Sequence, residues 1–134
     1  MAYGSKYVRK NVYDPDGAEW PDHVLWYARG VKAMQARALD DPLGWRFFAA
    51  IHGFDADLWT QLGHLSPSDP LPSQAARDRF WEQCQHQTWY FLPWHRGYLL
   101  ALEAAIRAEV VSLGGPAEWA LPYWNYFGPK DQYK

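Results

Sequence analysis

Residues 86–103 read HQTWYFLPWHRGYLLALE, and two of the chain's five histidines lie in this stretch, nine positions apart. On one continuous helix His86 and His95 would point to opposite sides, because each residue advances about 100° around the axis. Pro93 argues against a continuous helix, since proline lacks the backbone donor and is tolerated only in a first turn. The stretch therefore predicts a helix that begins at Pro93 and carries His95, after a less regular segment from which His86 folds back.

Outward from this stretch, prolines and glycines divide a chain whose pattern is helical almost throughout. The helix that begins at Pro93 should end near Leu113, before two glycines and a proline. Apolar spacing by threes and fours, and a serine cap at Ser73, predict three further helices, over 19–39, 44–55 and 74–83. The other segments are predicted to be a strand or extended arm (3–13), a turn (14–17), a loop with at most a short helical turn (56–72) and an irregular tail (121–129). The predicted fold class is mainly α.

Composition limits the class of protein. A chain of 134 residues suits one domain, and 49% hydrophobic with 21% charged residues is too apolar for a disordered protein. A net charge of −2 and a pI near 6.2 argue against binding to nucleic acid or an anionic membrane, and no apolar run is long enough to span a bilayer. The first ten residues lack the apolar segment of a secretory signal, which favours a cytoplasmic location. A single cysteine excludes a disulfide within the chain.

Aromatic residues are the unusual feature of the composition: nine Trp, nine Tyr and six Phe. They could simply build a bulky core, because large rings bury much apolar area. They also surround histidines in the windows 45–54 and 89–94, and aromatic walls with inward-facing imidazoles are typical of a dry metal or ligand pocket. His23, among polar neighbours on a helix, and His64, in the proline-rich loop, are interpreted as ordinary structural or solvated residues.

The candidate metal ligands are His52, His86 and His95. Three imidazoles from two or three different elements suit copper, zinc or iron about equally, so their spacing predicts a metal site without naming the metal. Cys84 lies two residues before His86, and alternate residues of an extended chain share one face, so sulfur and imidazole can come into contact. The alternative for Cys84 is a small buried residue at the end of the preceding helix, which is the commoner role of a free cysteine.

Residues 86–103 resemble the copper A signature of tyrosinases, catechol oxidases and molluscan haemocyanins. That signature is His, four or five residues, Phe-Leu-x-Trp-His-Arg, two residues, Leu, three residues and Glu, and every defined position is matched here. The upstream residues Ala-Ile-His-Gly (50–53) resemble the segment with the first ligand of the same copper. The downstream residues Leu-Pro-Tyr-Trp-Asn (121–125) resemble the family's Leu-Pro-Tyr-Trp-Asp segment, with Asn125 in place of the commoner aspartate. The resemblance covers residues 7–127.

The resemblance implies three ligands for one copper ion: His52, His86 and His95. It further implies a thioether bond between Cys84 and His86, since the Cys-x-His spacing matches that of fungal tyrosinases and molluscan haemocyanins. Such a bond would fix the ring of His86 and give a more preorganised site. Arg96 and Glu103 lie seven residues apart on one helix face, and both are interpreted as structural residues that orient this helix.

The chemistry of this family uses two coppers, each held by three histidines, which bind oxygen between them. This chain has five histidines, and it contains no His-x-x-x-His pair, the family's hallmark of the second copper. Residues 1–134 are therefore predicted to be the N-terminal, copper A part of a dicopper domain, and the resemblance implies half of its four-helix bundle. The copper B part would come from the rest of the protein or from a second chain. The apolar helix faces at 45–55 and 94–113 would pack against it or favour oligomers.

The function that the resemblance implies is the copper-dependent oxidation of phenols, as by a monooxygenase, or of o-diphenols, to o-quinones with O₂. The partners would be a phenolic small molecule, O₂ and the complementary copper B half. Two alternatives stay open: an oxygen-binding module of haemocyanin type, and a mononuclear metal-binding fragment that is inactive in isolation. The isolated chain is predicted to be inactive, because it lacks the histidines for a second copper.

Overall fold

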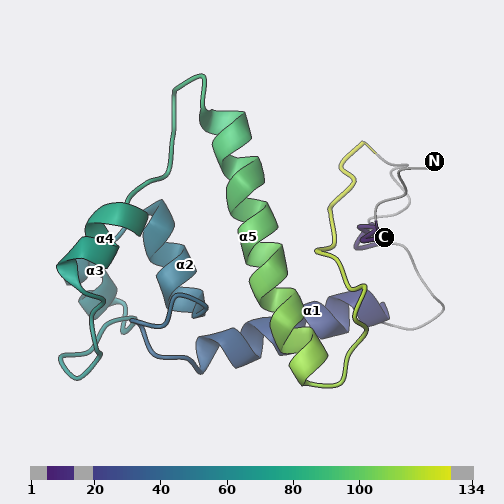
Figure 1. The fold of residues 1–134 in the computed structure, drawn as a ribbon, viewed down its shortest axis with the longest axis horizontal. Coiled ribbons are helices and arrows are strands. Elements are labelled where there is room, and N and C mark those ends of the chain that lie inside the picture. The colour runs from purple at the N-terminus through teal and green to yellow at the C-terminus, as the bar shows by residue number, and fades with distance from the viewer. Residues whose placement is uncertain (1–5, 14–19, 128–134) are drawn as a thin grey trace. The chain divides into compact units, whose positions relative to one another are not determined.

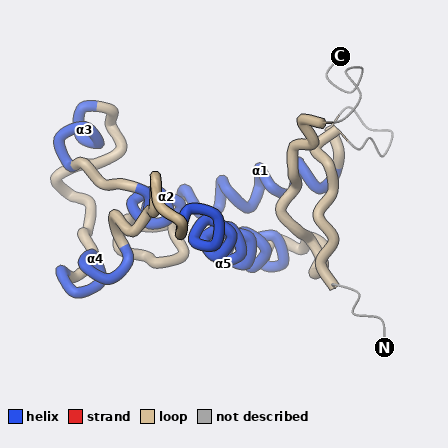
Figure 2. Tube along the Cα trace, turned by 90° about the horizontal axis from the view of Figure 1, so that it is seen from above, coloured by secondary structure: helices blue, strands red, loops and turns tan. Residues whose placement is uncertain are grey.

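The computed structural model describes residues 6–13 and 20–127, and these form five α-helices joined by loops (Figure 1). The helices are α1 (Asp22–Gln35), α2 (Trp45–His52), α3 (Ala56–Gln61), α4 (Gln74–Phe80) and α5 (Phe91–Ser112). The described residues contain no strand (Figure 2), and their single β-type pairing is an isolated parallel bridge between Asn11 and Tyr123. None of their helices is both long and apolar enough to cross a membrane. The mainly α fold is therefore confirmed, and the described part of the N-terminal arm has one bridge and no strand of its own.

Helix α1 is shorter than the predicted helix at both ends. It begins just after Pro21, whose carbonyl oxygen accepts hydrogen bonds from the backbone amides of Val24 and Leu25. The proline therefore stands immediately before the first helical residue and starts its hydrogen-bond pattern. The turn expected at 14–17 and the first residue of the predicted helix, Glu19, lie outside the described residues.

The second predicted helix, 44–55, is divided in two by a capping residue. Helix α2 ends at His52, and Asp55 instead caps the start of α3. The carboxylate of Asp55 accepts a hydrogen bond from the backbone amide of Leu58 at 2.9 Å, which satisfies a donor that the helix itself leaves without a partner. The short helical turn expected within 56–72 is therefore α3.

Helices α4 and α5 test two predictions about helix starts. The hydroxyl of Ser73 accepts a hydrogen bond from the backbone amide of Ala76 at 3.2 Å, so the predicted cap of α4 is confirmed. The helix ends at Phe80 and not at residue 83 as predicted, because the chain turns at Glu82, whose φ is positive.

Helix α5 begins at Phe91, two residues before the predicted start at Pro93. Pro93 therefore lies within the first turn, where its missing backbone donor leaves no helical hydrogen bond unmade. After α5 comes Gly114 with a φ of 83°, a left-handed conformation that favours glycine and ends the helix.

The chain divides into two compact units. One combines the residues up to Lys32 with those from Glu103 onward, and the other is Ala33–Leu102, so α1 and α5 contribute to both. The core of the second unit consists of Leu39, Phe47, Ala50 and Trp81. The rings of Phe47 and Trp81 meet edge to face with centroids 5.9 Å apart, which anchors α2 against the segment that follows α4.

In the first unit, α1 and the second half of α5 are in close contact at Gly30. A Cβ atom at this position would lie 2.9 Å from a side-chain carbon of Ile106 and 3.2 Å from its carbonyl oxygen. The absence of a side chain therefore lets the two helices approach. After α5 the chain returns to α1, where the buried Trp119 donates a hydrogen bond from Nε1 to the carbonyl oxygen of His23 at 2.9 Å.

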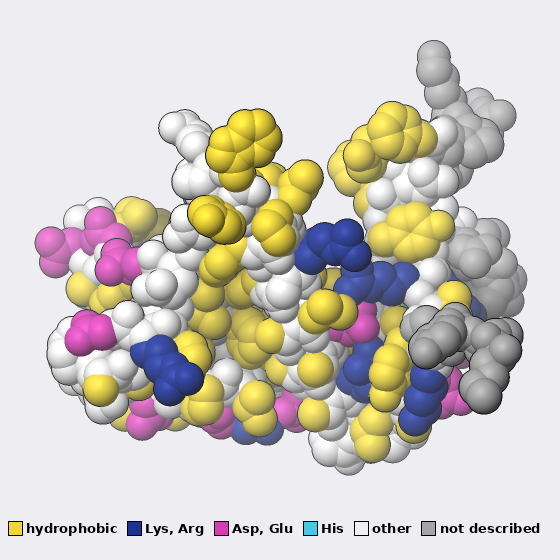
Figure 3. Space-filling view, turned by 45° about the horizontal axis from the view of Figure 1, so that its top comes forward, with side chains coloured by type: hydrophobic (Ala, Val, Ile, Leu, Met, Phe, Trp, Pro, Cys, Tyr) yellow, Lys and Arg dark blue, Asp and Glu magenta, His cyan; other side chains and the backbone are white. Residues whose placement is uncertain are grey.

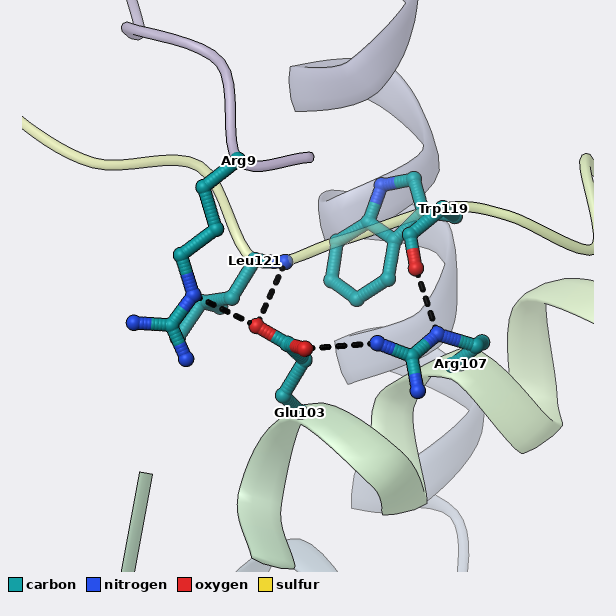
Figure 4. Close-up of polar contacts among 5 residues, drawn as sticks. All are labelled: Arg9, Glu103, Arg107, Trp119 and Leu121. Atoms are coloured by element: carbon teal, nitrogen blue, oxygen red, sulfur yellow. Dashed lines mark hydrogen bonds and ion pairs between the residues drawn. The ribbon is translucent and has the colours of Figure 1, made fainter. Parts of the chain in front are cut away.

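Glu103 connects three parts of this unit (Figure 4). Its carboxylate accepts hydrogen bonds from Arg9 at 2.7 Å, from Arg107 at 2.6 Å and from the backbone amide of Leu121 at 3.2 Å. Burial raises the pKa of Glu103, but these three partners together lower it by more, so the pKa lies below its ordinary value. The carboxylate ties the N-terminal arm and the segment after α5 to that helix, in agreement with the structural role predicted for it.

Candidate metal centre

The four residues selected from the sequence lie around the end of α2 and the beginning of α5. His52 is the last residue of α2, His95 lies near the start of α5, and Cys84 and His86 lie in the loop between α4 and α5. The ring centroids of His52 and His95 are 5.5 Å apart, as are those of His86 and His95. The structure therefore brings all four side chains together within the second unit.

Backbone hydrogen bonds position the loop that carries the cysteine. The amides of Glu82 and Gln83 donate to the carbonyl oxygens of Ala50 and Ile51, at 3.1 and 3.0 Å. Carbonyl oxygens in the last turn of a helix have no partner within that helix, so the loop satisfies two acceptors of α2. The loop turns at Glu82, whose φ of 56° is left-handed. These contacts bring Cys84 alongside the end of α2.

The imidazole of His95 is oriented by its own helix. Its Nδ1 lies 2.7 Å from the carbonyl oxygen of Phe91, one turn earlier. Because a carbonyl oxygen only accepts hydrogen bonds, Nδ1 carries the ring proton and Nε2 presents a lone pair. The Sγ atom of Cys84 lies 3.4 Å from this Nε2. The ring therefore directs its free nitrogen toward the sulfur, as a metal ligand requires.

Aromatic rings restrain His52. The ring of Tyr98 meets it edge-on, with centroids 4.3 Å apart at 89°, and Trp94 meets it at 5.5 Å. Tyr98 is fixed in turn, because its hydroxyl donates to the carbonyl oxygen of Phe48 at 3.0 Å and its ring stacks on Trp94. The sequence reasoning did not assign a role to Tyr98. Its position three residues after His95, on the same helix face, is the signal that could have identified it.

The donor atoms of His52, Cys84 and His95 form a compact group, in which one ligand atom from each residue lies within 4.8 Å of the others. His86 approaches the same sulfur, with its Nε2 3.4 Å from Sγ. The predicted ligand set contained three imidazoles, and the structure adds a sulfur atom among the converging donors. Imidazole nitrogen and thiolate sulfur in this number suit a copper or zinc ion.

Partial burial is the main influence on the protonation of this group, although His52 itself remains exposed on one side. This burial lowers the pKa of His52, and the neighbouring imidazoles of His95 and His86 lower that pKa further. Burial also raises the pKa of the Cys84 thiol and, together with the nearby sulfur, raises the pKa of Tyr98 to about 12. At neutral pH His52 is therefore a neutral imidazole, which is the form that binds metals, and Tyr98 keeps the proton that it donates.

The two histidines interpreted as ordinary residues stay outside the group. His23 is buried in the first unit, where its Nε2 lies 3.0 Å from the carbonyl oxygen of Asn11. His64 is exposed beside the ring of Trp59. Each has a structural or solvated environment, in agreement with the interpretation from the sequence.

A cavity of about 500 Å³ lies in the second unit between residues of α2, α4 and α5. Its lining includes Trp94 and Tyr98, but none of the four donor residues. A molecule in this cavity would contact the rings that restrain His52.

Three relatives resemble most of this chain. A tyrosinase of Hahella sp. (strain CCB-MM4) is 41% identical over 124 residues, which cover 89% of this chain and 25% of that protein. Aureusidin synthase of Antirrhinum majus is 26% identical over 123 residues, covering 91% and 18% of the two chains. A tyrosinase of Oryzias latipes is 30% identical over 108 residues, covering 79% and 17%. The chain thus spans a quarter or less of the length of these relatives.

The match to a protein family is broader than any single motif. Residues 42–133 match the family described as the common central domain of tyrosinase. The matched range contains the end of α2, the loop with Cys84 and the whole of α5, and hence all four converging donor residues. With most of its length matched, together with the helical fold and the histidine group that the signature predicts, the chain belongs to the tyrosinase family.

Proposed function

We propose that this chain provides one of the two copper sites of a tyrosinase-type oxidase, with His52, His86 and His95 as the copper ligands. The observation that supports the proposal is the convergence of three imidazoles where α2, the α4–α5 loop and α5 meet. The donor chemistry fits copper, because imidazole and sulfur are both ligands that copper accepts. Bound copper would supply the redox chemistry for oxidising a phenol or an o-diphenol to an o-quinone with O₂.

The chain's own groups prepare the imidazoles for this role. The hydrogen bond from His95 to the carbonyl oxygen of Phe91 fixes the ring and leaves its Nε2 without a proton. Tyr98 restrains the ring of His52, and burial favours the neutral form of that imidazole. The ring of Trp94 packs against both imidazoles, with centroids 5.5 Å from His52 and 4.8 Å from His95. Together these contacts orient two ligands before any metal arrives.

We propose that residues 1–134 form the copper A part of a larger catalytic domain and that a complementary part supplies the second copper site. Five histidines cannot provide six ligands, and the chain spans 25% or less of its relatives. Hydrophobic side chains gather at the surface around the beginning of α5 (Figure 3). Among them, Trp89, Tyr90 and Leu92 are 98%, 69% and 70% exposed. Large apolar side chains grouped in this way mark a contact surface, here for the complementary part.

We further propose the thioether between Cys84 and His86 for the mature protein. In the unlinked side chains, Sγ lies 3.4 Å from Nε2 of the His86 ring. The reaction would replace the S–H and one ring C–H by a single C–S bond, and the two electrons and two protons released would reduce one O₂ to hydrogen peroxide. The chain would become lighter by two hydrogens, which an intact mass measures directly.

The relatives favour an enzyme over an oxygen carrier of haemocyanin type. Two of the three are named tyrosinases and the third is named a synthase. Formation of an o-quinone from a catechol distinguishes the two functions, because an oxygen carrier binds O₂ without turnover.

Copper binding tests the proposed ligands. The full chain is loaded with copper in a Cys84→Ser background, so that only imidazoles are offered as ligands. The metal per chain is measured after gel filtration for this parent and for His52→Ala, His86→Ala and His95→Ala in the same background. We expect one copper per chain in the parent and a clear loss in each variant. His64→Ala, which changes an exposed histidine outside the group, should keep the metal. Full copper content in all three ligand variants would refute the assignment.

Activity is tested with the complementary part present. Catechol is offered to the copper-loaded protein with and without that part, and o-quinone is followed by its absorbance. We expect quinone only from the complete protein, and none from its His95→Ala variant. Turnover by the 134 residues alone would show that no complement is needed. A complete protein loaded with two coppers that produces no quinone would exclude the oxidase function.

A further inference from the structure

We propose that Cys84, while its thiol is free, is itself a copper ligand, so that this chain takes up Cu(I) through His52, Cys84 and His95. The proposal rests on the proposed function in one respect, namely that the metal is copper. It adds a ligand that a site of three imidazoles does not contain, and it concerns the chain before any bond joins the sulfur to His86.

The distances between the donor atoms match those around a metal ion. Metal–nitrogen and metal–sulfur bonds of about 2.0 and 2.3 Å in a tetrahedral site place the two donors about 3.5 Å apart. The Sγ of Cys84 lies 3.4 Å from Nε2 of His95, and the donor atoms of His52, Cys84 and His95 all lie within 4.8 Å of one another. An ion can therefore contact all three residues with small adjustments of their side chains.

The orientation of His95 supports the same site. Its Nδ1 donates to the carbonyl oxygen of Phe91, so the lone pair of Nε2 faces the sulfur of Cys84. In the metal-free chain, the thiol of Cys84 lies 3.4 Å from this nitrogen and can donate its hydrogen to it. A cation that takes the place of that hydrogen meets sulfur on one side and an imidazole lone pair on the other.

The sulfur also narrows the choice of metal that the histidines leave open. Imidazoles alone accept zinc, copper, iron and nickel, whereas a thiolate among them favours Cu(I) and zinc, and the proposed function selects copper of these two. Cys84 is half-buried beside His95, while His52 at the end of α2 remains exposed. An incoming ion can therefore reach His52 from solvent, whereas Cys84 and His95 are already in contact with each other.

The experiment uses the full chain, produced without copper and under reducing conditions, with its mass checked for the intact thiol. Cu(I) is titrated without oxygen against a coloured Cu(I) chelator, and X-ray absorption at the copper edge identifies the ligand atoms. We expect one Cu(I) per chain with a sulfur neighbour at about 2.3 Å. Cys84→Ser should lose the sulfur signal and bind Cu(I) at least about tenfold more weakly, since even indirect partners of a metal change its affinity ~10–100-fold. His64→Ala should match the wild type, and circular dichroism of both metal-free variants verifies their fold.

Four other results would overturn the proposal, and one of them would also overturn the proposed function. A wild type that holds Cu(I) through nitrogen alone, or a Cys84→Ser variant of unchanged affinity, would overturn the proposal and leave the proposed copper function in place. A chain that is two hydrogens lighter when produced without copper would also overturn it, because its sulfur would no longer be a thiol. Failure of the folded wild type to bind Cu(I) at all would overturn both the proposal and the proposed function.

Discussion

Single side chains decide how freely the imidazoles can move. His95 is fixed by a hydrogen bond within its own helix, which any histidine with a carbonyl oxygen one turn earlier can form. Among the described residues, the imidazole of His52 makes no hydrogen bond of this kind, and its orientation depends on the rings of Tyr98 and Trp94. The orientation of His52 therefore depends on how α2 packs against α5, and substitution of Tyr98 should disturb it.

Two substitutions at Tyr98 separate the ring from the hydroxyl. Tyr98→Leu removes the ring that meets His52, and we expect the free energy of unfolding to fall by about 2 kcal/mol and copper affinity to fall about tenfold. Tyr98→Phe keeps the ring and loses only the hydrogen bond to Phe48, so it should cost about 1 kcal/mol and leave copper affinity unchanged. Urea unfolding and copper competition measure the two effects. Equal copper affinity in the leucine variant would show that the ring does not position His52.

The carboxylate of Glu103 makes folding depend on pH. Burial opposes its charge, but Arg9, Leu121 and Arg107 outweigh burial and lower its pKa below the ordinary 4.5. Because the pKa of Glu103 is lower in the folded state, its carboxylate stabilises that state fully at pH values above the ordinary pKa of 4.5. This contribution is lost as the pH falls through the lower pKa of the folded state. We expect Glu103→Gln to lower the free energy of unfolding by about 3 kcal/mol at pH 7 and by progressively less as the pH falls below 4.5.

Urea unfolding of the wild type and of Glu103→Gln at several pH values measures this difference. Glu118→Gln changes an exposed glutamate of the same unit and should shift the free energy of unfolding by less than about 0.5 kcal/mol. A difference between wild type and Glu103→Gln that stays constant from pH 7 to below 4.5 would contradict a charged, stabilising carboxylate.

The contact between α1 and α5 depends on a glycine, and a second glycine provides the matched control. Gly30→Ala places a methyl group 2.9 Å from Ile106, so we expect a loss of about 1–2 kcal/mol after the better helix propensity of alanine is included. Gly97→Ala on α5 meets no atom within 4 Å, and it should stabilise by about 0.5–1 kcal/mol. Thermal and urea unfolding measure both. Stabilisation by both substitutions would mean that α1 and α5 are not in close contact at Gly30.

Helix boundaries that depend on local chemistry were predictable, and those that depend on competing signals were not. The cap at Ser73 and the stop before Gly114 follow from the side chain or backbone of the residue itself. One helix was predicted over 44–55, because Phe54 continues the apolar pattern past His52. In the structure α2 ends at His52, and Asp55, inside the predicted helix, caps the start of α3. Apolar spacing alone cannot decide which of two such signals prevails.

For the site, the sequence predicted which residues converge but not the contacts that hold them. His52, His86 and His95 were identified through a signature, and Cys84 through its spacing to His86. The hydrogen bonds from the α4–α5 loop to the end of α2 join residues about 32 positions apart, and the bond between Arg9 and Glu103 joins residues 94 positions apart. Pairings at such separations are set by how the whole chain packs, and a single sequence contains no local pattern that reveals them.

The surface around the beginning of α5 carries the last prediction, which concerns assembly of the complete protein. Trp89 and Leu92 are 98% and 70% exposed, and neither contributes a donor atom to the metal centre. If the complementary part covers them, replacing Leu92 by glutamine should weaken that association about tenfold, as loss of a buried apolar contact does at other interfaces. Copper binding by the chain alone should not change. Leu62→Gln, which alters a leucine of similar exposure at the end of α3, is the matched control and should leave association unchanged. Sedimentation velocity of the mixed parts measures the affinities, and an equal effect of the two leucine substitutions would show that the contact surface does not lie at the beginning of α5.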